Sequence, residues 1–191
     1  MRNDIYFDPM TVEWVMAHCD IARLGVQDGD SVYVVPVHFG YELDEHQHFH
    51  LYFHGNAAGQ RASLMQANPH IGVEMETDYQ LLPALQDSAF SARFRSVIGK
   101  GVVKELTDAA DKVHALTVMM HHYVARMPHP LTEAMVEQVH VWRVDLDEVS
   151  CKVKNPDHDW QMILKQLGHA LETTDAVTAS SQKSAADENQ E

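Results

Sequence analysis

The sequence lacks several features that would indicate a protein class directly. It has only two cysteines, Cys19 and Cys151, and they are not in Cys-x-x-Cys spacing. Neither a disulfide framework nor a thiolate metal site is indicated, so we expect two reduced thiols that are at least partly buried. No run approaches the roughly 20 apolar residues of a membrane-spanning helix. Residues 1–10 lack the apolar core of a signal peptide, so we expect a cytoplasmic protein.

Basic residues are scarce as well, with 14 Lys and Arg against 28 Asp and Glu and a formal net charge of −14. Such a chain repels nucleic-acid phosphates and anionic membrane surfaces, so we expect neither as a partner. The sequence has no Gly-x-Gly-x-x-Gly fingerprint, Walker loop, Gly-x-Ser-x-Gly elbow or zinc-ribbon spacing. These absences argue against a Rossmann dinucleotide site, a nucleotide-binding P-loop and a serine hydrolase.

The length and composition that remain are those of one globular domain. The chain has 191 residues, of which 45% are hydrophobic, enough for one substantial core. We expect that domain to span residues 1–160, followed by an extension over 161–191. The end of this extension, Thr173–Glu191, is rich in Ser, Ala, Gln, Asp and Glu and has no aromatic residue. We therefore expect the extension to be largely disordered.

The hydrophobic pattern predicts more strands than helices. Strand follows strand too directly for a doubly wound fold, so we expect a mainly β barrel with helices packed outside it. The expected strands are 21–26, 31–41, 49–53, 71–76, 94–106, 139–144 and 148–153, and the expected helices are 9–18, 57–67, 108–126 and 131–137.

Three details of this pattern can be tested against a structure. Val32–Val35 is apolar at both parities, so we expect this strand to be covered on both faces. Residues 77–92 are irregular and predict a loop, and Asp145, Asp147 and Glu148 predict a solvated turn between the last two strands. In the helix over 108–126 the spacing predicts one buried face, made of Val113, Leu116, Met120 and Val124, with Met119 and Tyr123 beside them.

The segment after the third strand, Leu51–Arg61, has the composition of an anion site. A strand end is followed by a flexible turn, then Gly59 and the cation of Arg61 at the start of a predicted helix. Free N–H groups at a helix N-terminus favour an anion, and an arginine can hold a phosphate. An ordinary turn with a solvated arginine explains the same spacing, so the alternative stays open on these residues alone.

Histidines form a second feature. In a regular strand His46, His48, His50 and His54 would share one face with Tyr52. Imidazoles at i and i+2 can bind a metal, but no tetrahedral ligand set accompanies them, so a solvent-facing strand is the preferred interpretation. We predict no metal site.

Three more histidines and a tryptophan allow two readings each. His114, His121 and His122 lie on a predicted helix, where surface imidazoles are the first reading and haem ligands the alternative. Trp142 is interpreted as barrel core or subunit contact, with flavin stacking as the alternative.

Several short motifs together resemble a known family. Tyr52-Phe53-His54-Gly55, Gly59-Gln60-Arg61 and Asn68-Pro69 are similar to the strand and helix motif of the nitroimidazole-resistance proteins. These belong to the pyridoxamine-phosphate-oxidase-like FMN-binding split barrels. Further pieces follow in the same order, Tyr33-Val34-Val35-Pro36-Val37 and Arg95-Ser96-Val97-Ile98-Gly99-Lys100-Gly101, so that the resemblance covers residues 2–155.

The resemblance implies a split barrel, a homodimer, and FMN bound where the two subunits meet. FAD or haem would be the other cofactors. Carried over by position, His54 would stand near flavin and substrate as the catalytic residue, and Gly59, Gln60 and Arg61 would hold the phosphate. Pro36, Val37 and His38 would line the isoalloxazine, and Arg95 and Ser96 would lie near the phosphate or ribityl chain. Gln60 stands where the family usually has a basic residue, which weakens the expected phosphate clamp.

The expected function is therefore that of an FMN-dependent oxidoreductase acting on small, electron-poor, nitroaromatic-like molecules. The alternative from another class is a non-catalytic protein that binds or senses flavin or haem. A third reading is a metal-binding protein that uses His46, His48 and His50.

Overall fold

The computed structural model describes residues 4–84, 89–126 and 129–168. The chain divides into two compact units, Met1–Asn155 and Pro156–Glu191. The sheet and the first four helices belong to the first unit, and α5 (His158–Gln166) belongs to the second. Much of the extension expected to be disordered, residues 169–191, lies outside the described residues.

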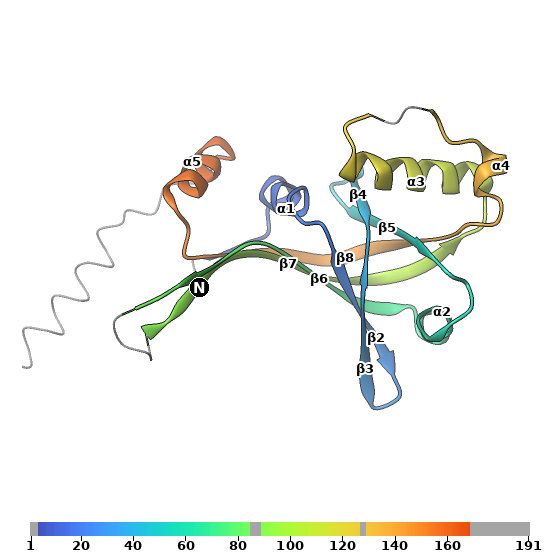
Figure 1. Ribbon diagram of the computed structural model, residues 1–191, viewed down its shortest axis with the longest axis horizontal. Helices are drawn as coiled ribbons and strands as arrows, with labels where there is room; N and C mark the ends of the chain where they lie inside the picture. The colour runs from blue at the N-terminus through green and yellow to red at the C-terminus, as the bar shows by residue number, and fades with distance from the viewer. Residues whose placement is uncertain (1–3, 85–88, 127–128, 169–191) are drawn as a thin grey trace, which may run out of the picture. The chain divides into compact units, whose positions relative to one another are not determined.

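One antiparallel sheet organises the first unit (Figure 1). Its order in the described residues is β3-β2-β6-β7-β8-β5-β4, and the short β1 pairs with β8. The strands are β1 (Ile5–Tyr6), β2 (Ala22–Asp28), β3 (Ser31–Val37), β4 (Gly40–Leu43), β5 (Phe49–Gly55), β6 (His70–Leu82), β7 (Ser91–Leu106) and β8 (His140–Lys154).

The sheet is curled into a barrel by a short connection between its edges. β3 and β4 lie at opposite ends of the strand order, yet only His38 and Phe39 separate them in the chain. Because two residues span so little distance, the two edges must approach each other without pairing, which is how a barrel remains split. Pro36 lies on the edge strand β3, where a missing N–H costs no ladder bond.

Aliphatic and aromatic side chains of alternate residues fill the interior. The largest fully buried residues of the strands include Leu24, Phe49, Leu51, Phe53, Met75 and Trp142. The Phe53 and Trp142 rings stack with centroids 5.6 Å apart, because these residues are direct partners on β5 and β8. The prediction that Trp142 is barrel core is confirmed. Both cysteines are buried and free, as expected.

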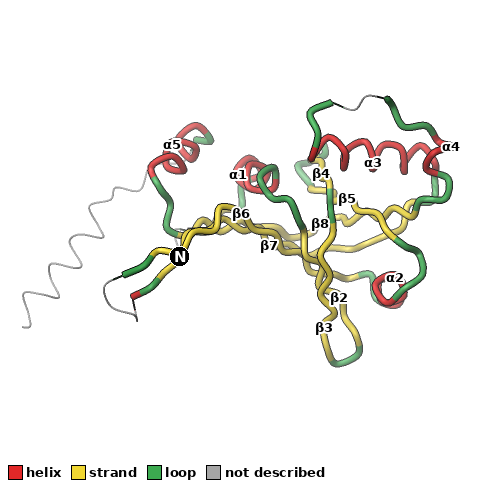
Figure 2. Tube along the Cα trace, in the orientation of Figure 1, coloured by secondary structure: helices red, strands yellow, loops and turns green. Residues whose placement is uncertain are grey.

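Helices cover the sheet at three places (Figure 2). α1 (Pro9–Met16) begins at the Asp8 cap and buries Val12 and Val15 against the long strands. α2 (Gln60–Ala67) follows β5 and packs on β2. α3 (Ala109–Tyr123), capped by Asp108, lies over β4 and β5 and is followed by α4 (Glu133–Val136).

The buried face of α3 differs from the prediction. Its buried residues are Ala115 and Met119, whereas Met120 and Val124 are exposed. A Cβ placed on Gly40 would lie 2.5 Å from the Cα of Met119. The glycine therefore lets β4 approach the helix backbone, and this contact decides which face of α3 is buried.

Three predictions about strands were wrong. β6 continues to Leu82 across a register shift between Thr77 and Gln80, so part of the expected loop over 77–92 is a strand whose backbone pairs with β7. The expected strand 31–41 is divided into β3 and β4 at His38. The expected pair 139–144 and 148–153 is one strand, β8, with a register shift opposite Lys100 and Gly101.

Charge pairing explains why β8 does not turn at its acidic residues. Asp145 forms ion pairs with Arg143 and Lys104, and Glu148 pairs with Lys100 at 2.9 Å. The predicted solvated turn is therefore a bulged part of a strand. The bulge requires a glycine at position 101, because a Cβ there would overlap the carbonyl oxygen of Asp145.

Within the described residues no helix is both long enough and apolar enough to cross a membrane.

Candidate functional site

The side chain of Arg61 occupies an unusual place in the barrel. Its guanidinium carbon lies 5.3 Å from the ring centroids of both Phe53 and Trp142. No ion pair joins Arg61 to a carboxylate of the described residues, and its Nε is buried without a hydrogen-bond partner there. Burial lowers the pKa of the guanidinium below its ordinary value, but an arginine stays charged at neutral pH. The aromatic rings therefore hold a cation whose counter-ion the described chain does not supply.

A glycine makes room for this cation. A Cβ placed on Gly55, the last residue of β5, would overlap the Nη2 atom of Arg61. The guanidinium thus lies against the main chain where β5 ends, and any larger residue at position 55 would displace it.

The helix start next to Arg61 adds uncapped backbone donors. Gly59 is the N-cap of α2, with φ 138°, and supplies no side-chain hydrogen bond to the first turn. The Gln60 amide instead donates to Asp28 Oδ2 at 2.9 Å, at the end of β2. The structure therefore places Gly59 and Arg61 together at the start of α2, while Gln60 is engaged with a carboxylate.

A second group of predicted residues lies beside α3. His38 and His54 line a cavity of about 180 Å³ together with Leu116, Met120 and Tyr123. The Tyr123 hydroxyl donates to the Asp20 carbonyl at 2.8 Å and accepts from the Phe39 N–H at 2.9 Å. These bonds hold the end of α3 against the segment that carries His38.

Sequence reasoning missed the α3 wall of this cavity. Leu116 and Met120 were predicted to be core, and nothing in the local pattern distinguishes an apolar residue that lines a cavity from one that fills the core. The sequence signal that could have indicated this cavity wall is Tyr123, near the end of the helix that follows the long strand β7.

The two groups lie on opposite faces of β5. Residues alternate along a strand, so Phe53 and Gly55 face the interior and Arg61, whereas Tyr52 and His54 face α3. Tyr52 is packed in a cluster with Leu106, Ala115, Met119 and Val141. Within one chain, the side chains of His54 and Arg61 therefore lie on opposite sides of β5.

Arg95 and Ser96 lie in a third place. Both are buried, Arg95 with only 5% of its surface exposed, near the start of β7. Arg95 forms an ion pair with Asp78, and its guanidinium carbon lies 5.6 Å from the Trp14 ring. Ten residues of β7 separate Arg95 from Glu105, the partner of Trp142, or about 33 Å along an extended strand. One chain does not bring Arg95 to Arg61.

One face of the sheet is open and apolar around the remaining predicted residues. Val37 is buried and Pro36 is exposed. Val32, Val34 and Ile98 are 67%, 59% and 59% exposed, so the prediction that β3 is covered on both faces is wrong for the single chain. This face has a hollow of about 360 Å³. Its lining includes Val34, Ile98 and the glycines Gly25, Gly72 and Gly99.

The other histidines have ordinary partners. His50 is half-buried and lies 2.7 Å from Asp145 and 3.4 Å from Asp44. His46 and His48 precede β5, and their backbone N–H groups both donate to Asp44 Oδ1. No group of three or more His, Cys, Asp and Glu residues in the described ranges is placed to hold a metal ion.

Comparisons with known proteins identify the fold. The structure superposes on that of a candidate 5-nitroimidazole antibiotic resistance protein from Bacteroides thetaiotaomicron with TM-score 0.65 and 28% identity, covering 80% of this chain and 93% of that one. A flavocytochrome from Azotobacter vinelandii matches with TM-score 0.66 and 23% identity, covering 81% and 73%. A protein from Mycobacterium smegmatis described as binding FAD and haem matches with TM-score 0.69 and 14% identity, covering 88% and 82%.

No curated protein matches the sequence significantly. The family model described as pyridoxamine 5′-phosphate oxidase matches residues 11–153, which include the whole sheet apart from β1 and the last residue of β8. The resemblance found in the sequence motifs is thereby confirmed, together with the mainly β split barrel that it implied. The chain belongs to the pyridoxamine 5′-phosphate oxidase family.

Proposed function

We propose that this protein binds FMN and acts as an oxidoreductase on small, electron-poor molecules. The observation that carries the proposal is the Arg61 guanidinium, held over Phe53 and Trp142 without a carboxylate partner in the described chain. A cation placed in this way favours an anionic ligand group, and the uncapped start of α2 favours it too.

The residues present fit a flavin phosphate. Arg61 offers a charged donor, Gly59 lets the main chain come close, and the absence of a side chain at Gly55 keeps the guanidinium in place. Asp28, which holds Gln60 at 2.9 Å, is the unfavourable neighbour. The phosphate clamp therefore rests on one cation, which makes Arg61 the residue on which affinity depends most.

A homodimer would complete the site. The exposed face around Val34 and Ile98 is apolar, and its glycines leave it hollow, as expected of a surface that packs against another chain. A mononucleotide cannot extend from Arg61 to Arg95 along β7, so Arg95 and Ser96 would reach the cofactor only from the second copy. We propose that Pro36, Val37 and His38 then line the ring at the same interface.

The chain's own groups would bind and orient the reactants. A bound flavin supplies the electron transfer that no side chain here can perform. His38 and His54 present imidazoles to the cavity beside α3, and Leu116 and Met120 restrict the access of water. His54 could hold or donate a proton at its ring nitrogen to a substrate in this cavity.

The similar structures support a flavin and leave its identity to experiment. Two of them are described by names that include FAD, haem or a flavocytochrome. A non-catalytic flavin or haem binder on the same fold is therefore the competing function. The haem reading lacks a metal-ligating group of three among the described residues, although a haem needs fewer protein ligands than that.

The absorption spectrum of the purified protein distinguishes these functions. A flavin band, with FMN identified after release by denaturation, supports the proposal. A Soret band without flavin would refute it. Turnover of a nitroaromatic by the FMN-loaded protein, compared with free FMN, then separates an oxidoreductase from a protein that only binds the cofactor.

A further inference from the structure

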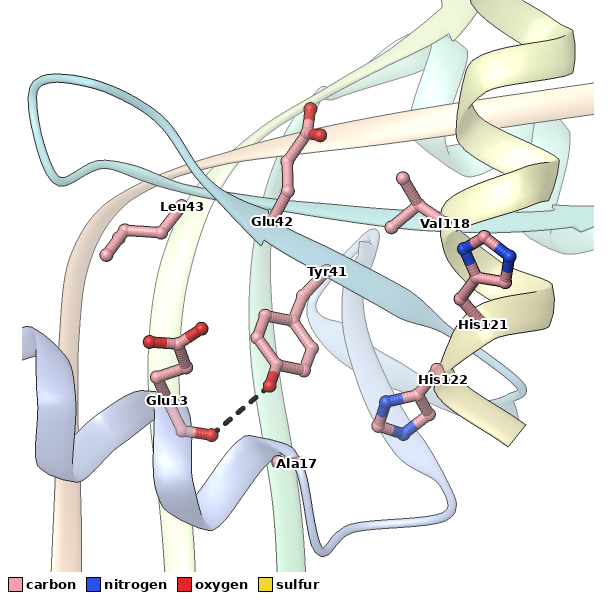
Figure 3. Close-up of a pocket in the computed structure, with 8 residues that line it drawn as sticks. All are labelled: Glu13, Ala17, Tyr41, Glu42, Leu43, Val118, His121 and His122. Carbon is pink, nitrogen blue, oxygen red and sulfur yellow. Dashed lines mark hydrogen bonds between the residues drawn. The ribbon is translucent and has the colours of Figure 1, made fainter. Parts of the chain in front are cut away.

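A larger cavity lies on the other side of α3 from the His38 and His54 pocket. It has a volume of about 560 Å³, and its lining comes from α1, β4 and α3 (Figure 3). Small-molecule sites commonly fall between about 300 and 1,000 Å³. The lining residues are Glu13, Ala17, Tyr41, Glu42, Leu43, Val118, His121 and His122.

The charge of this cavity has one sign. Two carboxylates line it, and no lysine or arginine does. Glu13 has an exposed side chain, and no hydrogen bond or ion pair joins its carboxylate to the described residues. A protein with a formal net charge of −14 adds to the negative potential. The cavity therefore disfavours anions, including a flavin phosphate or the propionates of haem.

The second carboxylate is held in a fixed position. Glu42 accepts hydrogen bonds from the Tyr52 hydroxyl and, at 2.8 Å, from the His114 ring. Burial alone would raise the pKa of Glu42, but these bonds outweigh it and the pKa lies below its ordinary value. The carboxylate is therefore ionised at neutral pH. Figure 3 shows it directed away from Tyr41 and Glu13, on the other side of β4, so it adds negative potential at the edge of the cavity while Glu13 is the carboxylate nearest the Tyr41 ring.

Apolar and aromatic groups form the rest of the wall. The Tyr41 hydroxyl donates to the Glu13 carbonyl at 3.3 Å, which joins α1 to β4. His122 is fixed by a 2.8 Å contact between its Nε2 and the Cys19 carbonyl. Figure 3 shows the Tyr41 ring between Glu13 on one side and His122 on the other. An aromatic face next to a carboxylate suits a cation that has an apolar body.

We propose that this cavity binds a small organic amine, with its ammonium group against Glu13 and its apolar body against Tyr41, Leu43 and Val118. The site is separate from the proposed flavin site. It lies on the opposite face of α3, because Val118 and His121 are about half a turn of the helix away from Leu116 and Met120. The proposal therefore does not depend on flavin binding.

Three compounds with the same phenyl body test the role of charge. Binding of 2-phenylethylamine, 2-phenylethanol and 3-phenylpropionate to the full-length protein is measured by calorimetry and by NMR titration. The amine should bind about fivefold or more tighter than the alcohol, and the carboxylate should bind most weakly. Equal affinity for amine and alcohol, or no binding of the amine, would overturn the proposal.

Two variants place the ligand in this cavity. Glu13→Gln should weaken the amine about fivefold and leave the alcohol unchanged, while Glu45→Gln, at an exposed acid outside the cavity, should change neither. Ala17→Phe should fill the cavity and abolish binding of both compounds. Unchanged amine binding in either cavity variant would refute the assignment. The flavin spectrum of both variants should equal that of the wild type, so that this proposal and the flavin proposal fail independently.

Discussion

The guanidinium carbon of Arg61 lies 5.3 Å from the centre of the Trp142 ring, and the described chain provides no carboxylate for it. Arginine over an aromatic ring is a stable arrangement in itself. Here it also keeps a positive charge at the end of β5, where α2 begins. The phosphate-binding part of the proposed function depends on this pair, and so does the first prediction.

Gly55→Ala should reduce flavin affinity without unfolding the protein. The new Cβ would overlap only the far end of the Arg61 side chain, which can move away. We expect the free energy of unfolding to change by less than about 1 kcal/mol and FMN affinity to fall about tenfold. Urea unfolding and fluorescence titration measure the two effects. Unchanged affinity would mean that the position of Arg61 is irrelevant to binding.

Gly40→Ala, unlike Gly55→Ala, should strongly destabilise the fold. Its Cβ would lie 2.5 Å from the Cα of Met119, and neither backbone can move aside alone. We expect a loss of about 2–3 kcal/mol in the free energy of unfolding, as for an overpacked core, measured by urea unfolding of the apoprotein. A loss no larger than that of Gly55→Ala would show that α3 is not packed on β4 as described.

His54→Ala should separate catalysis from cofactor binding. The side chain lines the cavity beside α3, on the face of β5 away from Arg61. We expect FMN affinity to stay within about twofold and turnover of a nitroaromatic to fall about a hundredfold, the usual range for losing a proton donor. If turnover and substrate KM both stay at wild-type values, His54 is only a packing residue.

Ile98→Glu should disrupt a homodimer. A charge on the apolar face next to Gly99 would be buried without a partner if two copies meet there. We expect sedimentation to show a monomer, with loss of bound FMN. Met135→Glu is the control, since Met135 is also an exposed apolar residue but lies on α4. A wild-type monomer, or a dimer that tolerates Ile98→Glu, would contradict the proposed interface.

Asp145→Asn should make the free energy of unfolding fall less steeply as the pH is lowered. Burial raises the pKa of Asp145, but hydrogen bonds from Arg143 and Lys104 outweigh it, so the folded pKa lies below its ordinary value of 3.8. A depressed folded pKa stabilises the protein above the unfolded pKa of about 3.9, and that stability is lost as pH falls through the folded pKa.

The measurement is urea unfolding between about pH 3 and pH 6. The wild type should lose stability more steeply than Asp145→Asn as the pH falls. Asp147→Asn, at an exposed neighbouring position, should follow the wild type. Parallel curves for all three proteins would rule out a contribution from Asp145.

Local patterns in the sequence were sufficient for much of the fold. The expected strands 21–26 and 31–41 begin within one residue of β2 and β3, and the expected helix 57–67 ends where α2 ends, before Asn68-Pro69. The order of short motifs identified the family. These signals succeed because turn chemistry and strand alternation depend on neighbouring residues alone.

The errors have long-range causes. Asp145 and Glu148 resemble a turn, but Lys104 and Lys100 on β7 neutralise them, and this pairing follows only from the strand register. The exposure of Val34 shows the same limit, because an apolar strand covered by its own chain and one left for a partner have the same sequence pattern. The predicted site residues His54 and Arg61 lie on opposite faces of β5, which the sequence did not reveal. The order of motifs along a chain does not specify which face of a strand each side chain occupies.

The relative affinity of the apoprotein for FMN and for riboflavin, which lacks the phosphate, tests the central claim most directly. The wild type should bind FMN about tenfold to a hundredfold tighter than riboflavin, as expected for a charge-assisted phosphate contact. Arg61→Ala should bring this ratio close to one while leaving riboflavin affinity nearly unchanged. A ratio that is the same in the wild type and in Arg61→Ala would contradict the account.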